Sequence, residues 1–392
     1  MCSVSTWGWA KLVDDMNGQG GASSRPHRIL QIHPMLRCNL RCSHCYSDSS
    51  PRAATSVAAD HILEAVADAA QLGYNVLSVS GGEPLLWRNL DEVCGFARSR
   101  GMKVQLASNG TLLSGRRLSD LKGLVDLYAV SLDGPEKLHN TIRKSDRAFA
   151  GLLDGIRHMS DTRTPFGIIY TLTRKSVKFL PWAAEFAARS GASLFQIHPL
   201  ELAGRATDMM AGETLSQTLL QRAYVATFLL RTLHPGMRIQ LDLLHKEALA
   251  DVLSSRENLA GELISPLVVE ADGSVVPLAY GIARDYAVCN LRDQRLSEAW
   301  PAYRSAGGYS AFQELCSRAA EAAMEREDIA IVNWYELVVQ MSRSRDRSIG
   351  AGLAPRHEGD PGRIIPPRDA PRREPTDAGQ RLRSVHAQPG GC

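Results

Sequence analysis

Cys38-Asn39-Leu40-Arg41-Cys42-Ser43-His44-Cys45-Tyr46 is the stretch that decides the fold and the chemistry expected of this chain. Three cysteines stand in the spacing C-x3-C-x2-C, and an aromatic residue follows the last of them. Three thiolates on a tight loop can bind three irons of a four-iron, four-sulfur cluster, for which proteins usually supply four cysteines. The remaining iron is then open to a small molecule, just as an open position marks a catalytic rather than a structural zinc site.

A zinc site is the alternative interpretation of the same loop. Zinc in a structural site takes four Cys or His ligands, and His44 is available as the fourth. The spacing of the cysteines alone does not exclude this alternative, so the motifs further along the chain have to decide.

Three of these motifs follow strand-like segments. Gly81-Gly82-Glu83-Pro84 follows the strand expected at 76–80, and its two glycines allow a ligand to approach the backbone closely. Ser108-Asn109-Gly110 closes the next strand, and Ser131-Leu132-Asp133-Gly134 closes the one after it. Ordinary turns are the alternative, because Asn-Gly and Asp-Gly are favoured turn pairs. A fourth motif, His139-Asn140-Thr141-Ile142-Arg143, ends in an arginine that could equally lie on the surface.

The cluster motif and these four segments together resemble the radical S-adenosylmethionine (SAM) enzymes. The resemblance implies a [4Fe-4S] cluster on Cys38, Cys42 and Cys45, whose open iron chelates SAM. Reductive cleavage of SAM in that family releases a 5′-deoxyadenosyl radical, which takes a hydrogen atom from the substrate. The glycine-rich motif would bind the SAM amino group, and Arg143 its carboxylate. The cofactor-binding residues that it implies are Tyr46, Gly81, Gly82, Glu83, Ser108, Asn109, Ser131 and Arg143.

Strand-like and helix-like segments alternate from residue 29 onward, which is typical of a parallel α/β architecture. Strands are expected at 29–32, 76–80, 104–107, 127–131, 166–171 and 194–198, and amphipathic helices at 60–72, 90–97, 148–159, 180–189 and 215–233. Six such units resemble the partial (β/α)6 barrel of radical SAM enzymes. His33, Tyr170 and His198 lie on these strands, where a core position and a substrate contact are both open.

Four regions are expected along the chain: an N-terminal extension at 1–28, the barrel at 29–235, a smaller C-terminal region at 236–345 and a disordered tail at 346–392. The stretch from Asp272 to Asp293 resembles the opening of a SPASM domain, which holds auxiliary clusters in peptide-modifying relatives. That pattern expects a cysteine where Leu278 stands. Only Cys289 and Cys316 remain nearby, too few for a second cluster, so a SPASM-like region without auxiliary clusters is expected. Ordinary packing is the expected role of both thiols, and of Cys94.

Composition narrows the class of protein. The formal charge of +3 over 392 residues implies no nucleic-acid partner, and no apolar run is long enough for a membrane span. Residues 1–17 lack the apolar segment of a signal peptide, and eight cysteines are too few for a disulfide-rich secreted scaffold. A cytoplasmic location is therefore expected. The resemblance to radical SAM enzymes also implies an electron donor such as flavodoxin or ferredoxin.

Three hypotheses for function follow. The first is a radical SAM enzyme, similar to peptide maturases, that modifies a precursor peptide or a protein. The second is a radical SAM enzyme that acts on a small molecule, such as a cofactor or an antibiotic precursor. The third is a metal-binding protein without catalysis. The residues do not specify the reaction.

Overall fold

Seven short hydrophobic strands build a parallel sheet in this protein. The structure is a computed structural model that describes residues 27–250 and 264–344. The tail expected at 346–392 lies outside the described residues, as does nearly all of the expected N-terminal extension. The parallel strands are β1 (Ile29–Ile32), β2 (Val76–Val79), β3 (Lys103–Ser108), β4 (Leu127–Leu132), β5 (Phe166–Leu172), β6 (Leu194–Pro199) and β7 (Arg238–Leu241). They pair in chain order from β1 to β7.

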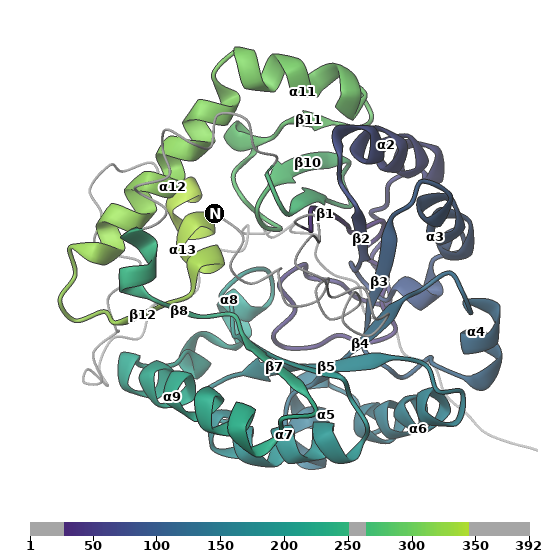
Figure 1. Cartoon of the computed structure of the whole chain (residues 1–392), viewed down its shortest axis with the longest axis vertical. Coiled ribbons are helices and arrows are strands. Elements are labelled where there is room, and N and C mark those ends of the chain that lie inside the picture. The colour runs from purple at the N-terminus through teal and green to yellow at the C-terminus, as the bar shows by residue number, and fades with distance from the viewer. Residues whose placement is uncertain (1–26, 251–263, 345–392) are drawn as a thin grey trace, which may run out of the picture. The chain divides into compact units, whose positions relative to one another are not determined.

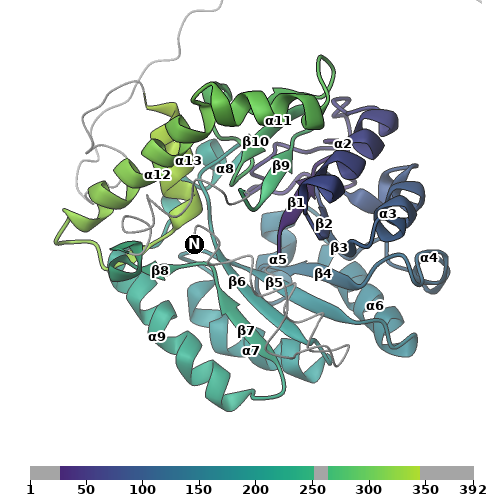
Figure 2. The ribbon, with the colours of Figure 1, turned by 45° about the horizontal axis from the view of Figure 1, so that its top comes forward.

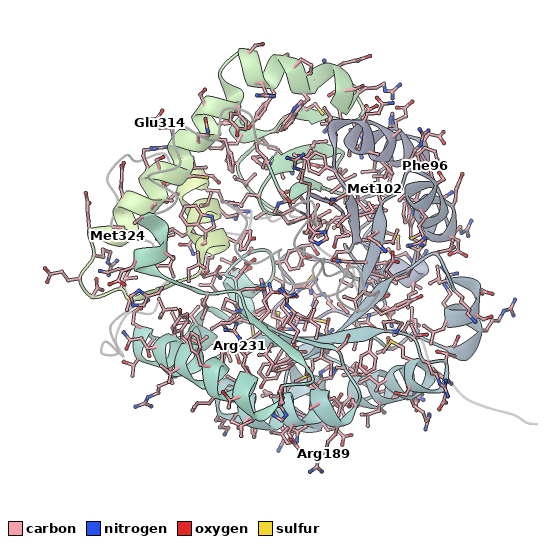
Figure 3. All side chains as sticks on the ribbon, in the orientation of Figure 1. Phe96, Met102, Arg189, Arg231, Glu314 and Met324 are labelled. Carbon is pink, nitrogen blue, oxygen red and sulfur yellow. The ribbon has the colours of Figure 1, made fainter. Side chains whose placement is uncertain are left out.

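The sheet curves into a partial barrel. Helices pack against its outer face, and its inner face encloses the inside of the barrel (Figure 1). The helices of this part are α2 (Ala59–Leu72), α3 (Leu90–Ser99), α4 (Gly115–Asp120), α5 (Glu136–Arg143), α6 (Ala148–Asp161), α7 (Leu180–Arg189), α8 (Ala206–Met209) and α9 (Gln217–Leu233). Arg189, at the end of α7, points away from the sheet (Figure 3). The predicted α/β architecture with a partial barrel is confirmed, and β7 adds a parallel strand beyond the six expected.

Strand side chains alternate between the two faces of the sheet, as the period of two requires. On β3, Val104 and Leu106 are fully buried on the face toward the helices. Gln105, between them, lines a cavity on the inner face, as do Gln31 on β1 and Gln196 on β6. The apolar core therefore lies between sheet and helices, and the inside of the barrel is polar.

The C-terminal region extends the same sheet. It contains β8 (Leu244–His245), β9 (Leu267–Val269), β10 (Ser274–Pro277), β11 (Cys289–Asn290), α11 (Leu296–Ser305), α12 (Gly308–Met324), β12 (Ile331–Val332) and α13 (Trp334–Arg343). Strand β9 pairs parallel to β1, and β10 and β11 continue outward from β9 as antiparallel strands. Figure 2 shows β9 and β10 beside β1, with α11 over them. The division into domains at residue 235 stays a prediction.

Five short 3-10 helices complete the described elements: η1 (Pro84–Leu86), η2 (Val177–Phe179), η3 (Ala211–Glu213), η4 (Lys246–Leu249) and η7 (Arg284–Tyr286). Among the helices of residues 27–250 and 264–344, none is both long and apolar enough to cross a lipid bilayer.

Candidate active site

A cavity of about 360 Å³ opens inside the barrel, at the end where the parallel strands finish. Sites form at this end of parallel sheets because the loops that follow the strands converge there. Most of the residues predicted for the site line this cavity: Cys38, Cys42, Cys45, Tyr46, Gly81, Gly82, Ser108, Asn109, Ser131 and Arg143. Glu83 alone among the predicted residues is not part of the lining.

The loop after β1 brings the three cysteines to this cavity. Cys38 and Cys42 are buried, and Cys45 is half-buried. Burial raises the pKa of the Cys38 thiol to about 11 and that of Cys42 to about 12. The sulfur atoms also accept hydrogen bonds, from Leu40 N to Cys38 Sγ (3.4 Å) and from Ser49 N to Cys45 Sγ (3.2 Å). Such bonds stabilise thiolates and tune the potential of an iron–sulfur cluster.

The donor set of this loop fits a cluster better than a single ion. Among the described residues, no three His, Cys, Asp or Glu side chains converge closely enough to hold one metal ion. Three thiols outside any disulfide nevertheless face one cavity, as ligands of three separate irons would. His44, the candidate fourth zinc ligand, contacts Asp133 Oδ1 through Nε2 at 2.9 Å instead. The single-zinc alternative therefore finds no geometric support.

The Gly81-Gly82-Glu83 turn packs against the cluster loop, which is residues 33–58 between β1 and α2. Gly81 has φ +112°, and a Cβ at Gly82 would lie 2.0 Å from the carbonyl oxygen of Arg37. The glycines are thus required by the backbone of the loop itself. Glu83 is fully buried behind the cavity wall, where its carboxylate accepts hydrogen bonds from Ser108 Oγ and Asn109 N, both at 2.9 Å. Burial raises the pKa of Glu83, although these donors oppose the shift.

The polar residues at the carboxyl ends of β3 and β4 form hydrogen bonds with neighbouring segments. The amide of Asn109 donates to Asn39 Oδ1 at 2.8 Å and so joins the end of β3 to the cluster loop. The hydroxyl of Ser108 donates to the Glu83 carboxylate, and Ser131 Oγ donates to the Ser108 carbonyl oxygen at 3.3 Å. All three side chains still line the cavity, so the SAM contacts expected of them stay predictions.

Asp133 is a buried acceptor in the segment after β4, for which the sequence left a SAM contact and a turn both open. It accepts from Arg143 Nε at 2.6 Å and contacts His44 Nε2 at 2.9 Å. Burial would raise the pKa of Asp133, but Arg143 and His44 outweigh it and hold that pKa well below its usual range. Arg143, predicted to pair with a ligand carboxylate, thus already has a protein partner while it lines the cavity.

A second polar cluster lines the cavity at the ends of β6 and β7. His198 on β6 contacts Asp242 Oδ2 through Nδ1 at 3.0 Å and Glu201 Oε1 through Nε2 at 3.5 Å. Enclosure would lower the pKa of His198, but the two carboxylates raise it to about 9. Asp242 also accepts from the amide of Gln196 at 2.6 Å. His198 was a candidate from its strand position, whereas nothing in the sequence pattern indicated Asp242.

Tyr280, from the C-terminal region, completes the cavity wall near the cluster loop. Its ring lies 4.7 Å from that of His33, and Tyr46 packs edge-on against the same histidine. Burial lowers the pKa of His33 to about 3, so this imidazole is neutral. Leu278, where the SPASM pattern expects a cysteine, has φ +68° and lines the same cavity.

The remaining described cysteines lie on three different secondary-structure elements. Cys289 is on β11 and Cys316 is buried in α12, while Cys94 is buried in α3. None of the three lines the cavity. Tyr170 is also buried, and its hydroxyl donates to the Ser176 carbonyl oxygen at 2.8 Å, as a core residue does.

Known proteins share sequence or fold with parts of this chain. Residues 32–176 match the model of the Radical SAM superfamily. An AdoMet-dependent heme synthase from Methanosarcina barkeri is 30% identical over 187 residues, which cover 47% of this chain and 54% of the relative. The chain spans about half the length of the curated relatives it matches.

Two solved structures share the fold. One is anSMEcpe with bound AdoMet, with a TM-score of 0.56 and 17% identity, covering 81% of this chain and 96% of that one. The other is Streptococcus suis SuiB bound to its precursor peptide SuiA, with a TM-score of 0.57 and 14% identity, covering 71% of this chain and 67% of that one. Identities this low establish the fold alone.

Proposed function

We propose that this chain, which carries a radical SAM domain over residues 32–176, cleaves SAM reductively and modifies a peptide or protein. The family uses a [4Fe-4S] cluster and SAM, and one solved neighbour was crystallised with AdoMet. The observation that carries the proposal is the cavity, because it brings the three cysteines together with Gly81 and Arg143. Cys38, Cys42 and Cys45 would hold the cluster, which when bound supplies the electron for SAM cleavage.

The charge of the cavity supports a neutral substrate. Within the described part of the chain, Arg143 is the one arginine or lysine in the lining, and Asp133 already binds it. The other charged groups of the lining are Glu201 and Asp242, which face His198. Carboxylates and phosphates of a polyanionic substrate need unpaired Arg or Lys partners. A peptide segment, which offers amides and few charges, fits the glutamines and serines of this lining better.

A small-molecule substrate is the second candidate. The likeness to a heme synthase favours it, since that relative is named for tetrapyrrole chemistry. A tetrapyrrole carries several carboxylates, however, and the lining described above offers them no unpaired cation.

The test begins with anaerobic reconstitution with iron and sulfide, followed by incubation with SAM and dithionite. Release of 5′-deoxyadenosine is expected from the reconstituted protein. Candidate precursor peptides and coproporphyrin III are then added separately, and each is analysed by mass spectrometry. A mass change in a peptide supports the proposal; turnover of the porphyrin alone would favour the second candidate. No 5′-deoxyadenosine with a full cluster would contradict both.

We propose a flavodoxin or a ferredoxin as the electron donor. We also propose that the protein is located in the cytoplasm. The location is supported by the six described cysteines, all of which are outside disulfides.

A further inference from the structure

Arg205 reaches the cluster loop from the segment between β6 and α8. The residue is 7% exposed, and its guanidinium lies against the second half of the loop. Nη1 donates to the Cys42 carbonyl oxygen at 2.6 Å, and Nη2 donates to the Ser49 carbonyl oxygen at 2.7 Å. Nη2 also pairs with Asp48 Oδ1 at 2.7 Å. One planar cation thus joins both ends of residues 42–49.

The backbone of residues 204 and 205 also contacts the loop. Arg205 N donates to the Cys45 carbonyl oxygen at 3.0 Å. The preceding residue, Gly204, has φ +55°, and a Cβ there would lie 2.3 Å from the carbonyl oxygen of Tyr46. Only glycine allows the two backbones to approach this closely. Residues 204 and 205 therefore contact the loop at Cys42, Cys45, Tyr46, Asp48 and Ser49.

The first half of the loop is held by other elements. Gly82 N donates to the Met35 carbonyl oxygen at 2.8 Å, and Glu83 N to that of Arg37 at 3.0 Å. These bonds hold the loop ahead of Cys38. Beyond Cys42, Ser43 N donates to the Ile142 carbonyl oxygen at 2.7 Å, so α5 also contacts the second half of the loop. The glycine-rich turn and the Gly204-Arg205 segment thus hold opposite halves of the loop.

We propose that Arg205, seated by Gly204, is a positioning residue that fixes Cys42 and Cys45 for cluster binding. It acts through the carbonyl groups of the loop and needs no contact with the cluster or with SAM. The planar guanidinium presents two separate donor nitrogens to the two carbonyls, whereas a lysine has a single donor nitrogen on a flexible chain. The inference rests on the radical SAM assignment proposed above but not on the nature of the substrate.

The test compares Arg205→Gln and Arg205→Lys with the parent after anaerobic reconstitution. Two rates are measured: iron release to a chelator, and amide hydrogen exchange over residues 42–49 in the protein before reconstitution. Losing charge-assisted bonds to two carbonyls is expected to speed both rates about tenfold or more in Arg205→Gln. Arg205→Lys, which keeps one bond, is expected between the parent and Arg205→Gln.

Two further variants serve as controls. Arg295→Gln removes a guanidinium that binds Asp68 Oδ1 at 2.6 Å, away from the loop, and should leave both rates unchanged. Asp48→Asn removes the exposed partner of Arg205 but keeps both carbonyl bonds, so its rates should stay within about twofold of the parent.

Circular dichroism and thermal melting establish whether each variant is folded. Rates within about twofold of the parent in folded Arg205→Gln would overturn the proposal. If Arg205→Gln does not fold, Arg205→Lys decides, and parent-like rates in that variant overturn it equally. Because neither rate depends on substrate turnover or on SAM cleavage, this test can fail while the proposed function stands.

Discussion

Tyr46 and Tyr280 meet edge to face inside the barrel, with ring centroids 5.4 Å apart and ring planes at 73°. Tyr46 belongs to the cluster loop, and Tyr280 to the C-terminal region just beyond β10. The imidazole of His33 contacts both rings and completes a group of three. The C-terminal region is thus part of the wall around the cluster loop.

Tyr280→Ala should therefore destabilise the whole fold. Loss of the ring is expected to cost about 2 kcal/mol, since an aromatic pair contributes about 0.5–1.5 kcal/mol beyond the burial that is lost with it. Urea unfolding of the parent and the variant measures the difference. Tyr280→Phe keeps the packing and should stay close to the parent, whereas equal stability of the alanine variant would show that the aromatic contact contributes little.

Replacing any one of Cys38, Cys42 and Cys45 by Ala should remove both the visible absorbance of the cluster and SAM cleavage. Each variant keeps only two of the three cysteine ligands, which is one fewer than a cluster of this family needs. Absorbance spectra and 5′-deoxyadenosine release after reconstitution provide the measurement. Cys94→Ala is the matched control, because that thiol is buried in α3 outside the cavity. Full cleavage by Cys42→Ala would sink the ligand assignment.

Asp133→Ala should destabilise the protein by about 3–5 kcal/mol, because it leaves the guanidinium of Arg143 buried without its partner. The double variant Asp133→Ala, Arg143→Met removes both charges, so its cost should be well below the sum of the two single variants. Chemical unfolding of the four proteins gives the coupling free energy. Additive costs would show that the two side chains do not interact.

The protein should bind one cluster, with about four irons per chain. Cys289 and Cys316 are on different elements, and neither lines the cavity. Iron analysis of the double variant Cys289→Ala, Cys316→Ala should therefore give the parent value. A fall to about half would reveal a second cluster at these thiols. Normal iron with lost product formation would instead indicate a chemical role for one of the two thiols.

His198 should make stability depend on pH. Its folded pKa of about 9 lies above the usual value, so its stabilising contacts are fully present below about pH 6.5 and are lost as the pH rises through about 9. The carboxylates that face it come from three segments: Glu201 after β6, Asp242 after β7 and Glu336 on α13.

The melting temperature of the parent should accordingly fall more between pH 7 and pH 10 than that of His198→Gln. A contribution of about 1 kcal/mol corresponds to a difference of about 1–2 °C in a protein of this size. Thermal melts at both pH values measure it, and equal falls in the two proteins would contradict the assignment of the raised pKa to His198.

The sequence predicted β1 and α7 with correct ends, because buried strands and amphipathic helices leave clear periodic patterns. It predicted the cysteine loop as well, since ligand spacing is local. It missed β7, whose four residues Arg238–Leu241 mix polar and apolar types too briefly to show a period. It also missed the pairing of β9 with β1, because the partners of a parallel pair are joined only through space.

Side-chain partners were the least predictable part of the site. Nothing in the sequence indicated that Asp133 binds Arg143 in the protein, and the expected contact of Arg143 with the SAM carboxylate stays a prediction. Arg205 was not recognised at all, because a lone arginine after a strand resembles any surface charge. In each case the partner lies on another element, and no local pattern encodes the distance between them.

The position of β9 also governs how the chain can fold during synthesis. Strand β1 pairs with β2 on one edge and with β9 on the other, so one edge of β1 keeps unpaired backbone groups until residues 267–269 have left the ribosome. Most of the barrel, including the cysteine loop, is synthesised before that edge is covered. Nascent chains halted before Leu267 should therefore aggregate or recruit chaperones, whereas chains that extend past Pro277 can close the edge of the sheet.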